Sequence, residues 1–251
     1  MHQLKGLYQK GVMPMYEYYK DKLEPQGKRI YEGLLRNISM LASVGYIELK
    51  GSFNSLVFRD AQYAYKALRL DRPEYFFLGH NLMTKYSSEG ILTIRHNLKY
   101  SWNHVIRMNR VLVHTVRELI SGTENMSILD RERTIYMRMG KNFIYKESDN
   151  AHDLSGLLVY KDGVCESLAA MLVVVFREAG IPSIVVQGYG KREPHRWSKV
   201  WIGENVYYLD ITWDMGKCKF GNRLEYFNLT SQQMSRDHQM VDIFTNAPLA
   251  M

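Results

Sequence analysis

The sequence has only two cysteines and no long apolar run. Neither Cys165 nor Cys218 lies in a CxxC or CxxH pattern, and two cysteines are too few for a disulfide framework. The longest apolar run, Leu168–Phe176, falls well short of the ~18 residues that a membrane-spanning helix needs. These absences exclude a disulfide-rich scaffold, and we expect no membrane span, no metal and no cofactor.

Proline is also scarce, with six residues in 251, and the chain has no internal repeat and no run of like charge. The composition, 46% hydrophobic and 24% charged, is that of an ordinary globular protein. The first 20 residues include basic side chains but lack the apolar stretch of a secretory signal. The sequence as it stands therefore predicts a cytoplasmic location. The cell envelope or secretion would apply if a leader had been removed.

The net charge of +7 is unevenly distributed. Residues 1–125 hold 18 Lys/Arg and 11 Asp/Glu, whereas residues 126–251 hold 15 of each. A dispersed, solvated basic surface is the default interpretation of such an excess, and an acidic partner at the N-terminal half is the alternative. No Arg-rich cluster, zinc finger or aromatic RNA-binding signature is present, so we expect no nucleic acid.

The N-terminal half has the periodicity of a mostly helical extension. Apolar residues recur at helical spacing over 26–44, 57–70 and 103–121. Short strands are predicted at 75–78 and 91–100. The polar segment around 122–126 is the expected hinge, which divides the chain into an extension, 1–125, and a chemical domain, 126–251.

The C-terminal half alternates helix and strand in an α+β order. Ser127 and Asp130 begin a helix that runs to about Phe143. A second helix, 165–179, is apolar all round and is closed by Gly180, so we expect it to be buried. The remaining elements are strands, predicted over 183–188, 196–202 and 206–211, with a hairpin turn at 203–205.

Cys165 stands at the start of the buried helix. A thiol at a helix N-terminus feels the positive end of the macrodipole, which stabilises its thiolate. The same position offers free backbone N–H groups to a developing oxyanion. A buried structural cysteine is the ordinary alternative, because free cysteine is among the most buried residue types.

His195 and Asp210 occupy the two strands of the predicted hairpin. With the turn centred on residue 204, Asp210 lies opposite Ser198, and His195 is its diagonal neighbour. A cysteine nucleophile needs a base that a third group orients, and these two residues are placed for those roles. Alternation along the strand should point Arg196 to the opposite face.

The segments GVCESLAAML, EAGIPSIVVQGYG and PHRWSKVWIGENVYYLDITWD resemble, in order, the core motifs of the transglutaminase-like superfamily. The resemblance covers about 127–240 and is thin over 1–125. It implies a papain-like, transglutaminase-like core, in which a buried cysteine helix packs on an antiparallel sheet. It also implies Cys165 as nucleophile, His195 as base and Asp210 as the orienting acid. His195-Arg196-Trp197-Ser198 departs from the frequent His-Ala-Trp-Asn, which bears on the substrate class.

The resemblance implies thiol-dependent acyl transfer on peptide or isopeptide bonds of a protein or peptide substrate. We favour hydrolysis, as by a cysteine peptidase or amidase, over amine cross-linking by a transglutaminase; peptide N-glycanase-like deglycosylation is also within the family. A non-catalytic peptide-binding or scaffolding module of the same fold is the alternative.

Four aromatic residues are candidates for substrate binding, although core or surface packing would explain each equally simply. They are Trp197, Trp213, Tyr189 and Tyr160. Asp214 is expected to cap the following turn, and His238 is interpreted as structural.

Overall fold

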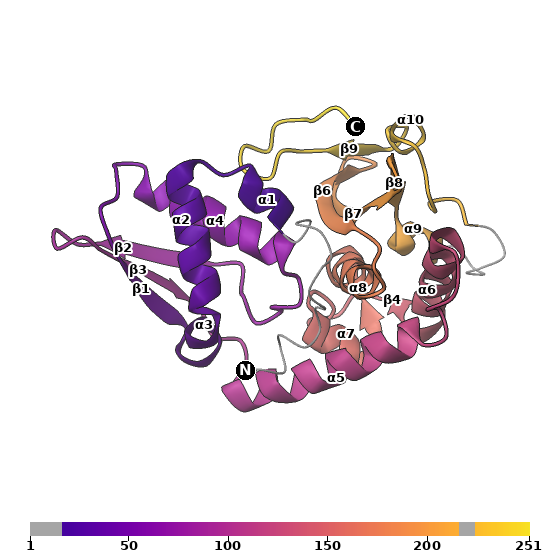
Figure 1. Ribbon diagram of the computed structural model, residues 1–251, viewed down its shortest axis with the longest axis horizontal. Coiled ribbons are helices and arrows are strands. Elements are labelled where there is room, and N and C mark those ends of the chain that lie inside the picture. Colours follow the sequence, from indigo (N-terminus) through magenta and orange to yellow (C-terminus); the bar gives the residue numbers. More distant parts are fainter. Residues whose placement is uncertain (1–16, 216–223) are drawn as a thin grey trace. The chain divides into compact units, whose positions relative to one another are not determined.

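The computed structural model describes residues 17–215 and 224–251, and it divides the chain into two compact units (Figure 1). The first, here called the N-terminal unit, ends at Asn109, and the second, the C-terminal unit, begins at Arg110. This boundary falls inside a long helix, α5 (Trp102–Ile120). The assignment of 1–125 and 126–251 to different roles remains a prediction.

The N-terminal unit combines helices with a small antiparallel sheet. Its helices are α1 (Tyr18–Asp21), α2 (Pro25–Arg36), α3 (Ile38–Val44) and α4 (Val57–Asp71). Its strands are β1 (Tyr46–Lys50), β2 (Leu82–Tyr86) and β3 (Ile91–His96), in the order β1-β3-β2. The unit is therefore less exclusively helical than its periodicity indicated.

The helical structure expected over 26–44 is confirmed as α2 and α3, which are separated at Asn37, whose side-chain amide donates to the Gly33 carbonyl. One local prediction in the N-terminal unit was wrong. The strand expected at 75–78 is a pair of turns, in which the Tyr75 N–H reaches the Arg72 carbonyl and the Leu78 N–H reaches the Tyr75 carbonyl. A run of aromatic residues after a proline can form turns as readily as a strand, and tertiary packing decides between them.

The C-terminal unit is built on a four-stranded antiparallel sheet in the order β8-β7-β6-β9. Its strands are β6 (Ser183–Gly190), β7 (Glu193–Ile202), β8 (Asn205–Leu209) and β9 (His238–Met240), with a separate parallel pair, β4 (Ile144–Tyr145) and β5 (Asp162–Gly163). Its helices after α5 are α6 (Ile128–Asn142), α7 (Leu154–Tyr160), α8 (Cys165–Glu178), α9 (Ile211–Met215) and α10 (Ser231–Met234).

Helix α8 packs on strands β6 and β7 and is the core of this unit (Figure 1). Its apolar side chains are buried on every face, as its composition predicted, and each contributes about 1.5–3 kcal/mol by leaving water. The largest of them are Leu168, Met171, Leu172, Val175 and Phe176. Gly180 ends the helix region with a φ of 78°. The α+β arrangement of a buried cysteine helix on an antiparallel sheet is confirmed.

Across the described residues, every helix is too short or too polar to span a bilayer.

Candidate active site

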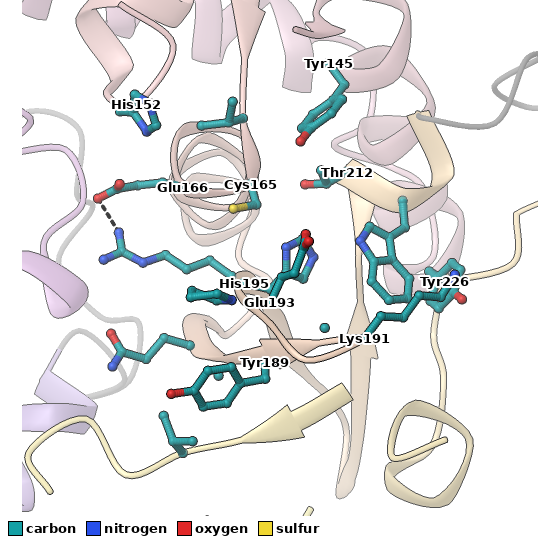
Figure 2. A pocket seen from close by; sticks show the side chains of 18 of the residues that line it. Tyr145, His152, Cys165, Glu166, Tyr189, Lys191, Glu193, His195, Thr212 and Tyr226 are labelled. Carbon is teal, nitrogen blue, oxygen red and sulfur yellow. Dashed lines mark hydrogen bonds and ion pairs between the residues drawn. The ribbon is translucent and has the colours of Figure 1, made fainter. Parts of the chain in front are cut away.

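Cys165 is the first residue of α8 and lies at the wall of a pocket of about 860 Å³ (Figure 2). Val164 before it is extended, so the chain enters the helix abruptly at the cysteine. The N–H groups of the first helical turn have no partner within the helix. The thiol and these donors therefore come from one short segment, which is the arrangement that acyl transfer requires.

Asp210 lies between β8 and α9 and is fully buried. Its Oδ1 accepts hydrogen bonds from the backbone N–H groups of Thr212 at 3.0 Å and Trp213 at 3.3 Å. Asp210 is thus the N-cap of α9, which fixes the carboxylate through local backbone geometry. The strand predicted over 206–211 is β8, which ends at Leu209 because Asp210 begins the turn into α9. The hairpin turn has two residues, Gly203 and Glu204, so Ser198 pairs with Leu209 and not, as expected, with Asp210.

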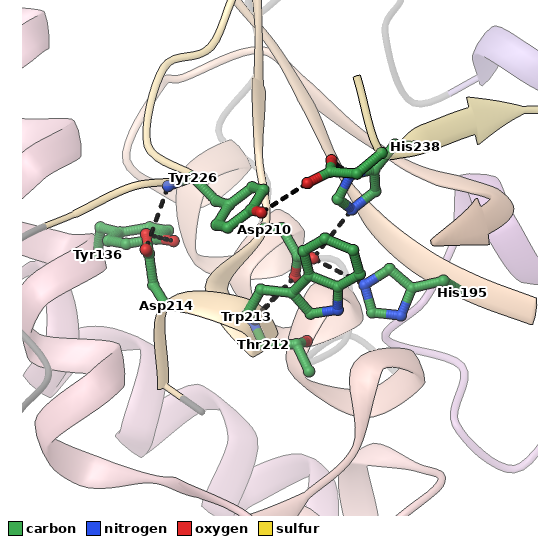
Figure 3. A network of polar contacts seen from close by, with 9 residues as sticks. Tyr136, His195, Asp210, Thr212, Trp213, Asp214, Tyr226 and His238 are labelled. Carbon is green, nitrogen blue, oxygen red and sulfur yellow. Dashed lines mark hydrogen bonds and ion pairs between the residues drawn. The ribbon is translucent and has the colours of Figure 1, made fainter. Parts of the chain in front are cut away.

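His195 on β7 reaches the other oxygen of this carboxylate. Its Nε2 donates to Asp210 Oδ2 at 2.7 Å (Figure 3). Cys165 and His195 line the same pocket (Figure 2). Burial disfavours a charged ring, but the bonds and charges of Asp210 and Cys165 outweigh burial and raise the pKa of His195 to about 9. The imidazole is therefore protonated at neutral pH.

Asp210 remains ionised in spite of its burial. Burial favours the neutral acid, yet hydrogen bonds from His195 and His238 outweigh that effect and hold its pKa below the usual value. His238 Nε2 donates to the same Oδ2 at 3.1 Å. The sequence indicated only a structural role for His238, and at a separation of 28 positions it gave no signal that His238 would contact Asp210.

Two tryptophan rings pack close to His195, and Gly190 leaves the space for one of them. Trp197 stacks on His195 with centroids 6.1 Å apart, and Trp213 lies 5.4 Å away at a tilt. A Cβ on Gly190 would lie 2.8 Å from the Trp213 ring and 3.1 Å from the His195 ring. The glycine in the GYG segment is therefore required by this aromatic packing, which was not predicted from the sequence.

The structure separates the four aromatic candidates. Trp213 and Tyr189 line the pocket, whereas Trp197 is buried beneath His195 and is absent from the lining. Tyr160 ends α7 with 59% of its surface exposed and does not line the pocket either. Two tyrosines that the sequence did not single out, Tyr145 and Tyr226, complete the aromatic part of the wall (Figure 2).

Charged residues line the rim in pairs. Arg196 forms an ion pair with Glu166, the second residue of α8, so the expectation that it points to the opposite face was wrong (Figure 2). The long side chain bends toward a carboxylate at the helix start. His152 lies 2.8 Å from Glu147 in the same way. The Arg196–Glu166 pair therefore brings opposite charges together in the pocket wall.

Asp214 has a wider role than the predicted turn cap. Its Oδ1 accepts from the N–H groups of Glu225 and Tyr226, and its Oδ2 accepts from the Tyr136 hydroxyl at 2.8 Å (Figure 3). The buried carboxylate thereby holds Tyr226 at the pocket and joins it to α6. Cys218 lies outside the described residues.

His195, Asp210 and His238 are the one cluster of potential metal ligands within the described part of the chain. The 2.7 Å between His195 Nε2 and Asp210 Oδ2 is a hydrogen-bond distance. Two ligands on a tetrahedral zinc ion stand roughly 3.3 Å apart, because each bond is about 2.0–2.1 Å. Protons rather than a cation therefore fit the cluster.

One comparison with known protein families finds a match for part of the chain. Residues 113–213 match the model of the Transglutaminase-like superfamily, and that segment contains Cys165, His195 and Asp210. No curated protein sequence matches this chain significantly.

Several solved structures are similar in part. A TGase crystal structure shares 13% identity, with a TM-score of 0.40, over 74% of this chain and 55% of its own. A candidate cysteine protease from Cytophaga hutchinsonii shares 12%, with a TM-score of 0.35, over 53% and 61%. The periplasmic domain of TgpA from Pseudomonas aeruginosa bound to ethylmercury shares 20%, with a TM-score of 0.34, over 52% and 62%. The alignments thus span about three fifths of these structures.

Proposed function

We propose that the protein is a thiol-dependent acyl-transfer enzyme that hydrolyses peptide or isopeptide bonds with Cys165, His195 and Asp210. The observation that carries this proposal is the His195 imidazole, which is hydrogen-bonded to the buried Asp210 carboxylate and lines the same pocket as Cys165. A thiol, a base and an orienting acid in this order are the parts that nucleophilic catalysis needs. We assign the chemistry to residues 126–251.

In the proposed reaction, the Cys165 sulfur attacks the carbonyl carbon of the substrate amide. Backbone N–H groups at the start of α8 stabilise the oxyanion. The His195 imidazolium gives its proton to the departing amine as the C–N bond breaks, which leaves a thioester on Cys165. Neutral His195 then takes a proton from water, whose oxygen attacks the thioester. The C–S bond breaks, the carboxylic acid product leaves, and the Cys165 thiolate and the His195 imidazolium are restored.

The pocket supports a peptide as substrate. Tyr189 and Trp213 offer flat apolar faces in the wall of the pocket that also contains Cys165, and polar side chains such as those of Arg196 and Glu166 are available to a peptide backbone. Hydrolysis is favoured because water has free access to the pocket, whereas cross-linking also requires a bound amine acceptor. We propose substrate contacts for Tyr189 and Trp213, and a supporting role beneath His195 for Trp197.

The test is turnover of a fluorogenic peptide library by the full chain, with and without an added primary amine. We expect amine-independent cleavage by the wild type and none by Cys165→Ala, whose small change should preserve the fold. Mass spectrometry of the products separates a free acid from an amide formed with the amine. Amide as the main product would replace hydrolysis with cross-linking. Equal peptide binding by both proteins without turnover would support the scaffolding module instead.

A further inference from the structure

A second histidine stands on the far side of the Asp210 carboxylate. His238, the first residue of β9, is buried, and its Nε2 lies 3.1 Å from Asp210 Oδ2. Its Nδ1 lies 2.7 Å from Asp237 Oδ1 (Figure 3). Both nitrogens of this ring therefore face carboxylate oxygens.

This geometry determines the charge of the His238 ring. An ionised carboxylate only accepts hydrogen bonds, so each ring nitrogen that faces one must carry a proton. The other oxygen of Asp237 accepts from the Tyr226 hydroxyl at 2.7 Å, which is consistent with an ionised Asp237. Burial and Asp237 raise the pKa of Tyr226 above its usual value, so its hydroxyl remains a donor. With both carboxylates ionised, the His238 ring donates from both of its nitrogens.

The position of β9 at the sheet edge makes this contact specific. His238 pairs with Gly190 and Met240 with Gly188, next to the strand that carries His195. A Cβ on Gly188 would lie 2.0 Å from the Gln239 carbonyl oxygen, so only glycine allows β9 to approach this closely. The chain therefore brings a second charged ring within 5.5 Å of the His195 ring.

We propose that His238 is a positioning residue, whose imidazolium fixes the shared Asp210 oxygen and weakens the hold of that oxygen on the His195 proton. The effect of His238 on catalysis rests on the proposed function of Cys165, His195 and Asp210. A carboxylate shared by two cations stabilises each of them less than it would stabilise one. His195 then binds its proton firmly enough to store it and loosely enough to release it to a leaving amine.

Few titratable groups face His238, so few other groups could shift the pKa of His195 when His238 is replaced. The charged ones are Asp210, Asp237 and His195, and the neutral ones are Tyr226, Trp213 and Trp197. Lys191 lies over the Trp213 ring at 5.0 Å, on the pocket side. Of the described side chains in this cluster, His195 and His238 are the two that contact Asp210 Oδ2.

The experiment is an NMR titration of His195 in the full chain labelled with 15N-histidine, with the signals assigned by their loss in His195→Gln. In His238→Gln we expect the His195 midpoint to rise by about one pH unit, because a positive charge about 5.5 Å away has gone. His114→Gln, on the exposed face of α5, is the matched control and should leave the midpoint unchanged. A merely structural role for His238 would lower stability without raising this midpoint.

A second variant tests the same idea with the His238 ring in place. Asp237→Asn removes one of the two carboxylates that hold the ring charged, so the His195 midpoint should rise again, by less than in His238→Gln. An unchanged or lowered midpoint in the folded variants would overturn the proposal. Since the titration needs no substrate, it can fail while peptide hydrolysis is confirmed, or succeed while the search for a substrate fails.

Discussion

The same residue types occur in both units of the chain, in contrasting surroundings. In the N-terminal unit, the buried Asp71 carboxylate accepts hydrogen bonds from the backbone N–H groups of Tyr19 and Lys20 at 2.9 and 3.0 Å. In the C-terminal unit, the buried Asp210 carboxylate also accepts two backbone N–H groups, but its second oxygen faces two histidines. Burial of a carboxylate is common to both, and the two histidine rings on Oδ2 are what distinguish Asp210.

The buried histidines of the two units differ in the same way. His96 donates from Nε2 to the Leu41 carbonyl at 2.9 Å, and burial lowers its pKa from the usual value. His195 faces a carboxylate and a thiol, and its pKa rises to about 9. Burial alone therefore favours a neutral ring, and a charged ring inside a protein requires a built partner. This difference separates a structural histidine from a candidate catalytic one.

The hairpin turns extend the comparison. The β2–β3 turn meets its need for a positive φ with Gly90, at 75°. The β6–β7 turn beside the pocket has positive φ at both Lys191 and Arg192, at 49° and 75°. Non-glycine residues in this region are strained, and such strain concentrates at functional sites. The β2–β3 turn thus has glycine at its positive φ, whereas the β6–β7 turn has lysine and arginine at theirs.

The largest expected effect is on kcat, and it should separate the two buried aspartates, Asp210 and Asp71. Asp210→Asn should lower kcat on a cleaved peptide by on the order of 10³- to 10⁴-fold, because the imidazole loses its orienting charge. Asp71→Asn should leave kcat unchanged and lower the free energy of unfolding by about 1–3 kcal/mol, since one backbone N–H loses its acceptor. The measurements are steady-state kinetics and urea unfolding of both variants. Similar kcat values for the two would remove the distinction drawn between these carboxylates.

The next effect is the pH dependence of stability, and the two histidines should give opposite signs. The His195 pKa is raised, so its stabilising contribution is complete below about pH 6.5 and is lost as pH rises through about 9. Relative to His195→Gln, the wild type should lose up to ~3 kcal/mol of unfolding free energy between these values. The His96 pKa is lowered, so its contribution is present above about pH 6.5 and is lost as pH falls.

Urea unfolding of wild type, His195→Gln and His96→Gln from pH 5 to 10 measures both signs. His96→Gln should therefore close its stability gap to the wild type, or reverse it, at the acidic end. A wild-type curve parallel to that of His195→Gln across the whole range would mean that His195 is not held charged by its neighbours.

The sequence located Cys165 and His195 in the chain better than it located their neighbours. Cys165 begins the predicted helix, and His195 lies on β7, whose hairpin with β8 has a strong local signal. Asp210 was expected in the second strand of that hairpin, but it caps α9. His238 was missed because its contact depends on β9 pairing with β6, a long-range event without a local signature. The turn at 75–78 was misassigned because an aromatic run has no period that separates strand from turn.

The smallest expected effect concerns the strained turn. Arg192 is exposed and does not line the pocket, so Arg192→Gly should change only the backbone cost of its positive φ. We expect a gain of about 1 kcal/mol in unfolding free energy, because glycine adopts this region without a Cβ penalty. The matched variant in the other unit is Gly90→Ala, which should lose a similar amount or more, since its Cβ would lie 2.9 Å from the Gly51 carbonyl oxygen. Urea unfolding at pH 7 measures both changes. If Arg192→Gly destabilises the protein, the Lys191–Arg192 turn is held by contacts of the Arg192 side chain, and strain is not what distinguishes the two hairpins.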